Sequence, residues 1–390
     1  MKTYFSLFIV SIILFSCLNL YGQRLNIQKE AITLLKSGIL KEADEALRSN
    51  PITITNFQTE RSAGGKHDFF SEGDYWWPDP QHPDGPYIQK DGLTNPDNFT
   101  AHRTAMINFS KMIGALTSAY ILTNDEKYAR KAFEHARAWL IDTATRMNPH
   151  MLYAQAIKGK FTGRGIGIID MIQFMEVAQS LLKLEHSKSA DKVEYKLFRN
   201  WFDQYLKWIT SHPYGIDEKN AVNNHATCWT MQVAAFAKFT GNKLLIDTCI
   251  YRYKYVHLPE QMDIDGSFPK ELNRTKPFGY SLFNLDAMSM LCQILSDKYN
   301  NLWNYSTQNN KSIEKGISFI TPFVKNKDSW PFKKDLMYWD QWPVAQPFLL
   351  FGAYALKKDD LFNTWEKLDH APQTDEIIRN LPVRHPLIWF

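Results

Sequence analysis

Cysteine is scarce in this chain. The 390 residues include four cysteines, and one of them, Cys17, lies in an apolar stretch near the N-terminus. The other three, Cys228, Cys249 and Cys292, are widely separated and odd in number. This pattern excludes a disulfide framework and shows no metal-ligand spacing. We therefore expect buried free thiols and no metal site.

An excess of charge of either sign is also lacking. Lys and Arg number 45 against 41 Asp and Glu, which gives a formal net charge of +4. This balance argues against a nucleic-acid partner, although it allows a local basic cleft for a polyanion. Charged residues make up 22% of the chain and hydrophobic residues 44%, which is typical of a globular protein rather than a disordered one.

After the N-terminus, we find no apolar run long enough to span a membrane. Residues 1–22 combine Lys2 with an apolar run from Tyr4 to Phe15, which is typical of a cleaved signal peptide. The mature chain, residues 23–390, would then be exported across the inner membrane, and we expect it in the periplasm. The alternative is lipid attachment at Cys17, because LFSC is a loose lipobox.

Strand signals and internal repeats are scarce as well. From Ala101 onward, apolar residues recur at helical spacing, and short turns such as Asn124-Asp125 and Gly241-Asn242 separate the segments. We expect helices over residues 27–47, 103–123, 126–141, 166–184, 191–210, 220–239, 243–257, 280–298, 309–321, 345–357 and 360–368. Helix pairs joined by short turns without a fixed period predict an all-α, α/α toroid rather than a solenoid. Because no interdomain linker is visible, we expect residues 23–390 to form a single domain.

Aromatic residues are abundant, with 12 Trp, 18 Tyr and 25 Phe. Many of them lie in a segment from Pro51 to Asn98 that is too rich in Gly and Pro for a long helix. A loop of this length is usually functional. Its three adjacent rings either plug the mouth of the toroid or stack on sugar rings, and both roles can hold together. The candidate substrate-binding residues of this loop are Lys66, His67, Tyr75, Trp76 and Trp77.

Two further segments carry candidate polar contacts. His102 and Arg103 begin a predicted helix, where they either reach a substrate carboxylate or form an ordinary helix start. In MLYAQAIKGKFTGRGIG, Tyr153 and Gln155 alternate with apolar residues, and Arg164 is either a cleft cation or a helix-start residue. The glycines of this segment lack the Lys-Ser/Thr of a phosphate-binding loop, so they are a weak signal for phosphate.

Three polar residues, Asn223, Asn224 and His225, stand together at the start of an otherwise apolar segment. Burying such groups without partners would cost about 1–3 kcal/mol each. One interpretation is that Asn223 caps the helix and the other two residues are solvated. The position of an Asn-His pair at the start of a helix, near an aromatic cleft, favours a functional site.

Arg274 and Tyr280 form another candidate pair, six positions apart. Tyr280 follows Gly279 at the start of a predicted amphipathic helix, so its hydroxyl either faces a cleft or bonds to backbone inside the core. Upstream, Asp263 and Asp265 lack the remaining ligands of a calcium loop. In MYWDQWPVAQPF, the candidates for a further cleft wall are Tyr338 and Trp339.

Together these motifs resemble those of the alginate-lyase type of polysaccharide lyase. The resemblance runs from about Ser62 to Phe351 and rests on HDFFSEGDYWWP, on NNH, and on Arg274 and Tyr280 followed by SLFNLDAM. Typical alginate lyases space the Arg and the Tyr one residue further apart, which indicates a sister group. The resemblance implies an incomplete α/α barrel with a long groove beneath the aromatic loop. It also implies an acidic polysaccharide as partner, with alginate first and glucuronan second. We expect a monomer or a weak dimer.

By this resemblance, Asn224 and His225 neutralise the carboxylate of a uronate, Arg274 assists them, and Tyr280 protonates the leaving C4 oxygen. Neutralisation matters because the C5 proton is very weakly acidic while the carboxylate stays charged. In mannuronate the C5 proton and the C4 oxygen leave from the same face, so Tyr280 could act as base and then acid. In guluronate they leave from opposite faces, and His225 would be the better base. Arg274 would also lower the pKa of Tyr280. Organic donors suffice for this scheme, so no cofactor is expected.

Two rival functions remain open from the sequence. A glycoside hydrolase on the same toroid would need two carboxylates that flank the bond, and Asp74, Asp79 and Asp340 are candidates. A non-catalytic glycan-binding protein would need the aromatic residues but not the Asn-His and Arg/Tyr pairs together.

Overall fold

The computed structural model describes residues 26–390. The predicted signal peptide and Cys17 lie outside these residues. The inner layer of the fold consists of α2 (Ala101–Thr123), α4 (Phe174–Leu184), α7 (Asn224–Thr240), α11 (Pro277–Leu295) and α13 (Pro347–Leu356). Each of these helices packs on the next in this order, so they form an arc.

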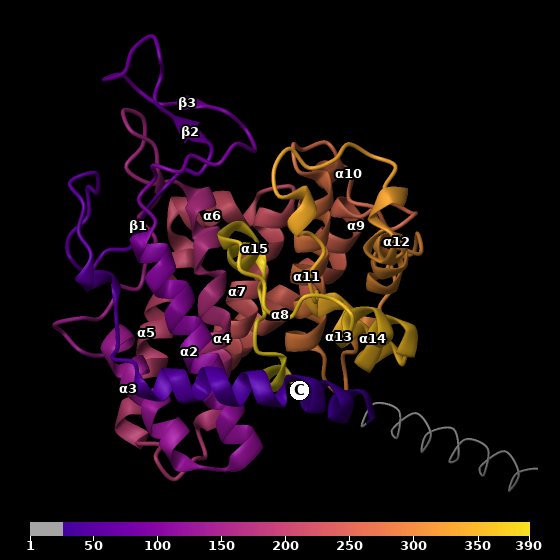
Figure 1. Cartoon of the computed structure of the whole chain (residues 1–390), viewed down its shortest axis with the longest axis horizontal. Helices are drawn as coiled ribbons and strands as arrows, with labels where there is room; N and C mark the ends of the chain where they lie inside the picture. Colours follow the sequence, from indigo (N-terminus) through magenta and orange to yellow (C-terminus); the bar gives the residue numbers. More distant parts are fainter. Residues whose placement is uncertain (1–25) are drawn as a thin grey trace, which may run out of the picture.

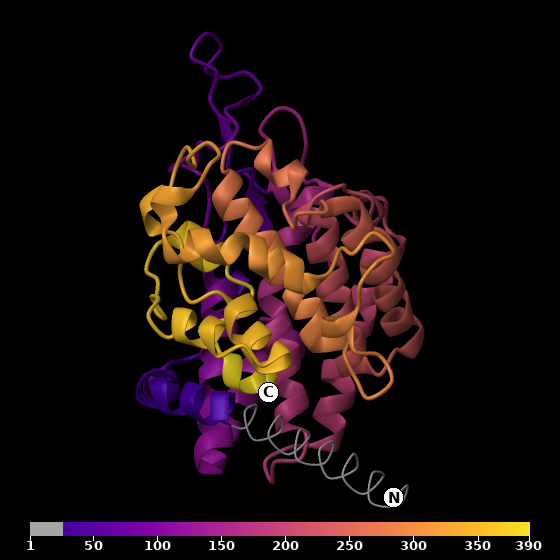
Figure 2. The ribbon, with the colours of Figure 1, turned by 90° about the vertical axis from the view of Figure 1, so that its right-hand side faces the viewer.

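A second layer of helices covers the outside of the arc (Figures 1 and 2). It consists of α3 (Glu126–Leu140), α5 (Lys192–Ser211), α8 (Lys243–Arg252), α12 (Ile313–Lys325) and α14 (Asp359–Trp365). α3 packs on α2, α5 and α8 pack on α7, α12 packs on α11, and α14 packs on α13. The predicted all-α, α/α toroid is therefore confirmed.

Polar capping residues start the outer helices. Asn124 and Gly241 adopt the left-handed conformation that ends one helix, with φ of 54° and 74°. The next residues, Asp125 and Asn242, then accept hydrogen bonds from the first turns of α3 and α8. These short turns reverse the chain, which is why helices adjacent in sequence become neighbours in space.

Burial distinguishes the inner helices from the outer ones. α7 and α11 are buried along nearly their whole length, whereas α3 and α5 bury one face. The prediction that α11 is amphipathic is therefore wrong, because neighbouring helices surround it. Within residues 26–390, α2 and the segment Gly165–Leu184 are long and apolar enough by composition to cross a membrane. Our expectation that no apolar run after the N-terminus is long enough to span a membrane is therefore wrong. Both segments are mostly buried inside the protein.

Several short elements were not predicted. They comprise α6 (Pro213–Lys219), α9 (Leu258–Gln261), α10 (Pro269–Leu272) and α15 (Asp375–Asn380), together with the strands β1 (Phe70–Glu72), β2 (Trp76–Trp77), β3 (Ile88–Gln89) and β4 (Tyr153–Ala156). β1 pairs in parallel with β4, and β2 pairs with β3 as an antiparallel hairpin. The hairpin stands out above the helical layers in Figure 1.

The remaining turns are short. The 3₁₀ turns are Ile54–Asn56, Gly165–Gln173, Leu302–Asn304, Lys327–Ser329, Trp339–Gln341 and Pro386–Trp389, and a π turn covers Tyr253–His257. Two predicted helices are therefore not uniform, because the first half of 166–184 is 3₁₀ and the last turn of 243–257 is π. A helix over residues 26–48 crosses the base of the molecule beside the C-terminus (Figure 1).

Candidate active site

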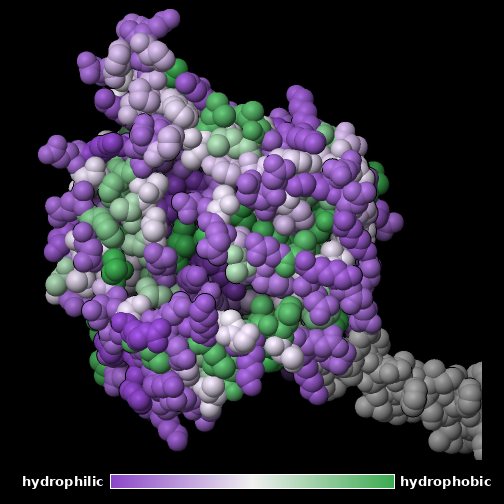
Figure 3. Space-filling model, in the orientation of Figure 1, coloured by the Kyte–Doolittle hydropathy of each residue, from purple (hydrophilic) through white to green (hydrophobic). Residues whose placement is uncertain are grey.

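A cleft opens where α7 and α11 begin, below the β2–β3 hairpin. Its cavity encloses about 770 Å³, including the open mouth, and Asn224, His225, Arg274 and Tyr280 all line it. Figure 3 shows this face of the molecule as largely hydrophilic, with a hollow near its centre. Helix N-termini carry partial positive charge. The first N–H groups of α7 and α11 already donate to Glu271 and Asp335, so side chains must supply the donors for a ligand at this end of the toroid.

Asn224 is held in place by a buried carboxylate. Its backbone N–H and its side-chain amide donate to the two oxygens of Glu271, at 2.7 and 3.0 Å. Glu271 is fully buried, and burial raises its pKa to about 7. The side chain of Asn223, at the N-cap position, makes no capping hydrogen bond. Glu271 therefore caps the first N–H group of α7, and the interpretation of Asn223 as the capping side chain is wrong.

His225 forms a pair with a second buried carboxylate. Its Nδ1 lies 2.8 and 3.1 Å from the two oxygens of Glu218, which leaves Nε2 for the cavity. Burial by itself lowers the pKa of His225, but the charge of Glu218 and the hydrogen bond outweigh burial and raise this pKa. The imidazolium, which has donors on both nitrogens, is therefore favoured.

The hydroxyl of Tyr280 donates to or accepts from the hydroxyl of Tyr75, at 2.7 Å. The Arg274 guanidinium lies 4.7 Å from the centre of the Tyr280 ring. Burial is the largest influence and raises the pKa of Tyr280, while Arg274 and the Tyr75 hydrogen bond partly oppose it. Arg274 thus lowers the pKa of Tyr280 as expected, but the expectation that this pKa lies below its usual value is wrong, because the residue is only 9% exposed and poorly solvated.

A buried lysine, Lys276, lies against the rings of both tyrosines. The Nζ of Lys276 lies 4.8 Å from the ring centre of Tyr75 and 5.7 Å from that of Tyr280. It pairs with Glu376 of α15 at 2.5 Å. The C-terminal part of the chain is thereby tied to the two hydroxyls of the cleft.

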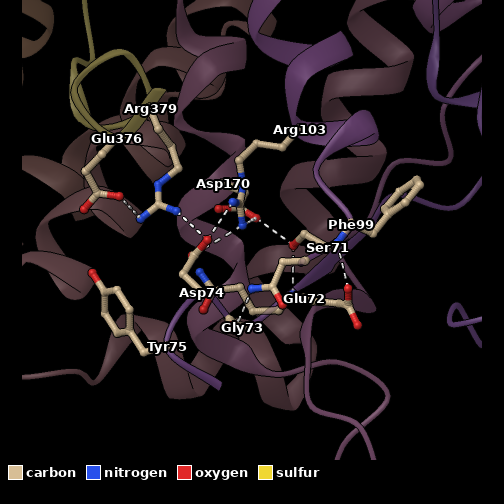
Figure 4. A network of polar contacts seen from close by, with 12 residues as sticks. Ser71, Glu72, Gly73, Asp74, Tyr75, Phe99, Arg103, Asp170, Glu376 and Arg379 are labelled. Atoms are coloured by element: carbon tan, nitrogen blue, oxygen red, sulfur yellow. Dashed lines mark hydrogen bonds and ion pairs between the residues drawn. The ribbon is translucent and has the colours of Figure 1, made fainter. Parts of the chain in front are cut away.

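An ionic network fixes the floor of the cleft (Figure 4). Asp74 accepts from Arg103 at 2.8 Å and from Arg379 at 2.7 Å, and Arg103 also reaches Asp170 at 3.1 Å. Ser71 donates to Asp170 at 2.7 Å. Burial alone would raise the pKa of Asp74, but the two arginines outweigh it and lower this pKa to about 2. Asp74 therefore stays charged and cannot serve as a general acid near neutral pH.

The other carboxylates of the hydrolase hypothesis are also poorly placed. Asp79 pairs with His82 at 3.2 Å and does not line the cleft cavity. Asp340 is exposed and outside that cavity. The pair of flanking carboxylates that a glycosidase requires is therefore not formed by these three residues.

Eight of the predicted site residues come together around the cavity. They are Tyr75, Trp76, Gln155, Arg164, Asn224, His225, Arg274 and Tyr280. Gln155 has an uncommon positive φ of 49°, and its carbonyl and side chain both accept from Arg164. Segments that are far apart in sequence thus build a single site.

The remaining predicted residues lie outside the cavity lining. Both nitrogens of His102 are used by backbone groups of Phe70 and Phe57, and Arg103 belongs to the ionic network. Of the two roles considered for these residues, the structure shows contacts within the protein, and neither residue lines the cavity.

The other predicted residues of the aromatic loop and of the later segments also lie outside the cavity lining. Trp77 donates to the Leu93 carbonyl, and His67 lies 2.6 Å from the Arg146 carbonyl. The others that do not line the cavity are Lys66, which is exposed, and Tyr153, Asn223, Tyr338 and Trp339, which are half-buried.

Several residues of the site were missed from the sequence. They are Glu218, Glu271, Lys276, Glu376, Asp170, Arg379, Asn380, Asp91 and Gln89. Most are single charged residues in segments that look like solvated surface, so the sequence offered no signal for them. Within residues 26–390, no group of three or more His, Cys, Asp or Glu side chains is placed to hold a metal ion.

This chain is similar in sequence and in fold to known alginate lyases. Residues 53–330 match the alginate lyase family. The crystal structure of an alginate lyase from Bacteroides ovatus is 32% identical, with a TM-score of 0.81 over 95% of this chain and 97% of that one. Alginate lyase A1-III from Sphingomonas species A1 is 13% identical, with a TM-score of 0.54 over 90% of this chain and 94% of that one, and so shares the fold. A search of curated protein sequences gave no match.

The family match covers most of the chain, including the Asn-His pair, Arg274 and Tyr280. The similarity to the Bacteroides ovatus structure covers nearly the whole of both chains. This chain therefore belongs to the alginate lyase family of polysaccharide lyases.

Proposed function

We propose that this chain cleaves alginate by β-elimination and acts preferentially at mannuronate. The observation that carries the proposal is that Asn224, His225 and the buried hydroxyl of Tyr280 face one cavity. The similar protein from Bacteroides ovatus is an alginate lyase, and a histidine-to-alanine variant of alginate lyase A1-III was solved with a tetrasaccharide. These relatives support alginate as the substrate.

The donors at the start of α7 suit a uronate carboxylate. Glu271 takes one hydrogen of the Asn224 amide and leaves the other for a ligand. His225 presents Nε2, and the raised pKa keeps a proton on it. Together with Arg274 they would neutralise the carboxylate, which makes the C5 proton more acidic and stabilises the charge that develops on its removal.

Tyr280 is the group for proton transfer. In a syn elimination its phenolate first takes the C5 proton, and the hydroxyl formed in that step then donates the proton to the leaving C4 oxygen, which regenerates the phenolate. Burial raises the pKa of Tyr280 and so favours the hydroxyl. Arg274 and Tyr75 both favour the phenolate against the effect of burial, and the phenolate is the form that would take the C5 proton. One side chain on one face of the sugar can therefore serve both steps of a syn elimination.

The preference for mannuronate follows from the protonation of His225. Elimination from guluronate needs a base on the face opposite the acid, and a neutral His225 would be the candidate. The pairing with Glu218 favours the imidazolium, which neutralises a carboxylate but cannot accept a proton. Glucuronan, in which the same two groups also leave from one face, is the alternative substrate.

Initial rates on separate polymers test this proposal. The formation of an unsaturated uronate is followed by its near-ultraviolet absorbance on polymannuronate, polyguluronate and glucuronan. We expect the highest kcat/KM on polymannuronate. Equal or faster cleavage of polyguluronate would contradict the preference, and the absence of unsaturated product from all three would contradict the proposed function.

A further inference from the structure

Arg164 is unlike the other arginines that line the cleft cavity, because within residues 26–390 it forms no direct ion pair, and Asp74 and Asp170 act on its charge only from a greater distance. Arg379 pairs with Asp74 at 2.7 Å, and Arg274 lies 3.4 Å from Asp91. Within residues 26–390, the partners of the Arg164 guanidinium are the carbonyl and the side-chain oxygen of Gln155, at 2.8 and 3.3 Å. Both are neutral acceptors, so the charge of Arg164 is not balanced by an ion pair.

The surroundings of Arg164 hold it in one orientation. Its guanidinium lies 5.8 Å from the ring centre of Trp76, on the wall formed by the β2–β3 hairpin. A Cβ at Gly73 would come within 2.9 Å of the terminal nitrogen of Arg164, so the absence of a side chain there makes room for it. Gln155 adopts φ of 49° while it accepts both hydrogen bonds. The chain therefore keeps an uncommon backbone conformation at the residue that orients this cation.

This orientation leaves most donors of Arg164 free. A guanidinium has five N–H groups, and two of them are used by Gln155. Burial lowers the pKa of Arg164 to about 10, so the group stays charged near neutral pH although it has lost solvent. A partly desolvated cation with a planar fork of unused donors is suited to a carboxylate from a ligand.

The reacting carboxylate does not need Arg164, because Asn224, His225 and Arg274 already supply its donors. Arg164 comes from the junction between β4 and the turn Gly165–Gln173, whereas Asn224 and His225 begin α7. Both groups nevertheless line the same cavity, so a chain of sugar units could reach them together.

We propose that Arg164 binds the carboxylate of the uronate next to the one that is cleaved, so that the enzyme recognises two consecutive uronates. This inference rests on the proposed function. It narrows the substrate class to polymers in which uronates are adjacent. Polymers that alternate a uronate with a neutral or amino sugar would leave Arg164 without an anion.

Random chemical reduction of carboxylates to alcohols in polymannuronate tests the inference. If two adjacent carboxylates are needed, kcat/KM of the wild type falls with about the second power of the fraction of carboxylates that remain. If only the reacting carboxylate is needed, it falls with the first power. In Arg164→Gln we expect a 10- to 100-fold lower kcat/KM on the unreduced polymer and a first-power dependence, because one charge-assisted contact is lost.

Two further variants separate recognition from structure. Arg164→Lys keeps the charge and should retain a dependence steeper than the first power. Lys160 also lies against Trp76, at 4.8 Å, but does not line the cavity, so Lys160→Gln should keep the second-power dependence. A Tm for Arg164→Gln close to that of the wild type would exclude a loss of folding.

The outcomes distinguish the inference from the function on which it rests. A first-power dependence for the wild type, or a second-power dependence for Arg164→Gln, would overturn the role of Arg164 while leaving the lyase activity intact. No unsaturated product from the wild type on unreduced polymer would instead contradict the proposed function.

Discussion

The orientation of Asn224 and the pKa of His225, the two residues that begin α7, depend on buried carboxylates that hydrogen-bond to them. Glu271 fixes Asn224 through two hydrogen bonds, and Glu218 raises the pKa of His225. Neither acid lines the cleft cavity. The donors that line the cavity are thus oriented by groups outside its lining, which keeps the donors fixed in place.

Replacing Glu218 tests this arrangement through pH. In Glu218→Gln the pKa of His225 should fall, because the opposite charge that raises it is gone. The imidazolium then persists only to lower pH, so the limb of the kcat/KM profile that falls with rising pH should move down by about 1–3 pH units. Measured pH profiles on polymannuronate check this.

A matched control is available on the same helix. Asp217 is adjacent to Glu218 on α6 but exposed, so Asp217→Asn should leave the profile in place. An unchanged profile in Glu218→Gln would show that His225 does not act as the cation.

Glu271 should make stability depend on pH. Its pKa is raised from 4.5 to about 7 by burial, so the folded protein holds this proton more tightly than the unfolded chain. Its contribution to stability is complete below about pH 4.5 and is lost as the pH rises to about 7, by up to ~3 kcal/mol. Relative to the wild type, Glu271→Gln should lose less stability over this interval in denaturant titrations. An identical pH dependence in the two proteins would contradict the assignment.

At the residue scale, the sequence indicated the side chains that line the cavity, but it did not indicate the buried acids that hold them. Asn224, His225 and Tyr280 stood out because polar or aromatic residues begin apolar helices there. Glu218 and Glu271 stand beside Lys219 and Lys270, and such charged runs are usually solvated. Their burial depends on how α6 and α10 dock on α7 and α11, which no local pattern encodes.

At the scale of elements, α15 acts as a clamp. This six-residue helix pairs through Glu376 with Lys276 and through Arg379 with Asp74, and all four side chains are largely buried. The clamp joins the C-terminal segment to the loop before α11 and to the loop that carries Tyr75. Short as it is, α15 therefore helps to position both tyrosines of the cleft.

Removing one partner of this clamp should be costly. In Glu376→Gln the buried Lys276 loses its counter-charge, and we expect a loss of about 3–5 kcal/mol in the free energy of unfolding. The control is Glu366, which is exposed at the end of α14. Glu366→Gln should change the free energy of unfolding by no more than about 0.5 kcal/mol. Equal free energies of unfolding for the two variants in denaturant titrations would show that the Glu376–Lys276 pair does not stabilise the fold.

Element type was predictable where the pattern was long. The helices of both layers follow from apolar periodicity and from polar residues at turns, and their ends shifted by a few residues. α6 and α15 were missed because each is shorter than two helical turns, too short for an apolar period to show. The two-stranded pairings were missed because strands of two to four residues leave no alternation to detect.

At the scale of the whole molecule, the toroid brings five distant segments to one end. The cavity is lined by residues from 74–91, 155–172, 224–225, 274–283 and 379–380. Sequence motifs identified four of these segments. The contribution of the fifth, residues 379–380 of α15, became visible only in the three-dimensional structure. The inner helices α7 and α11 are nearly fully buried, so they form a firm base for the side chains at their N-termini.

The most direct test of this account is the chemistry of the new chain end. Oligosaccharides released from polymannuronate in ¹⁸O-labelled water are analysed by mass spectrometry. Elimination predicts products with an unsaturated terminal uronate, one water lighter than saturated products and free of label from the cleavage. In Tyr280→Phe their rate of formation should fall by about 10²–10⁴-fold. Saturated, labelled ends from the wild type, or near-normal turnover by Tyr280→Phe, would contradict the account.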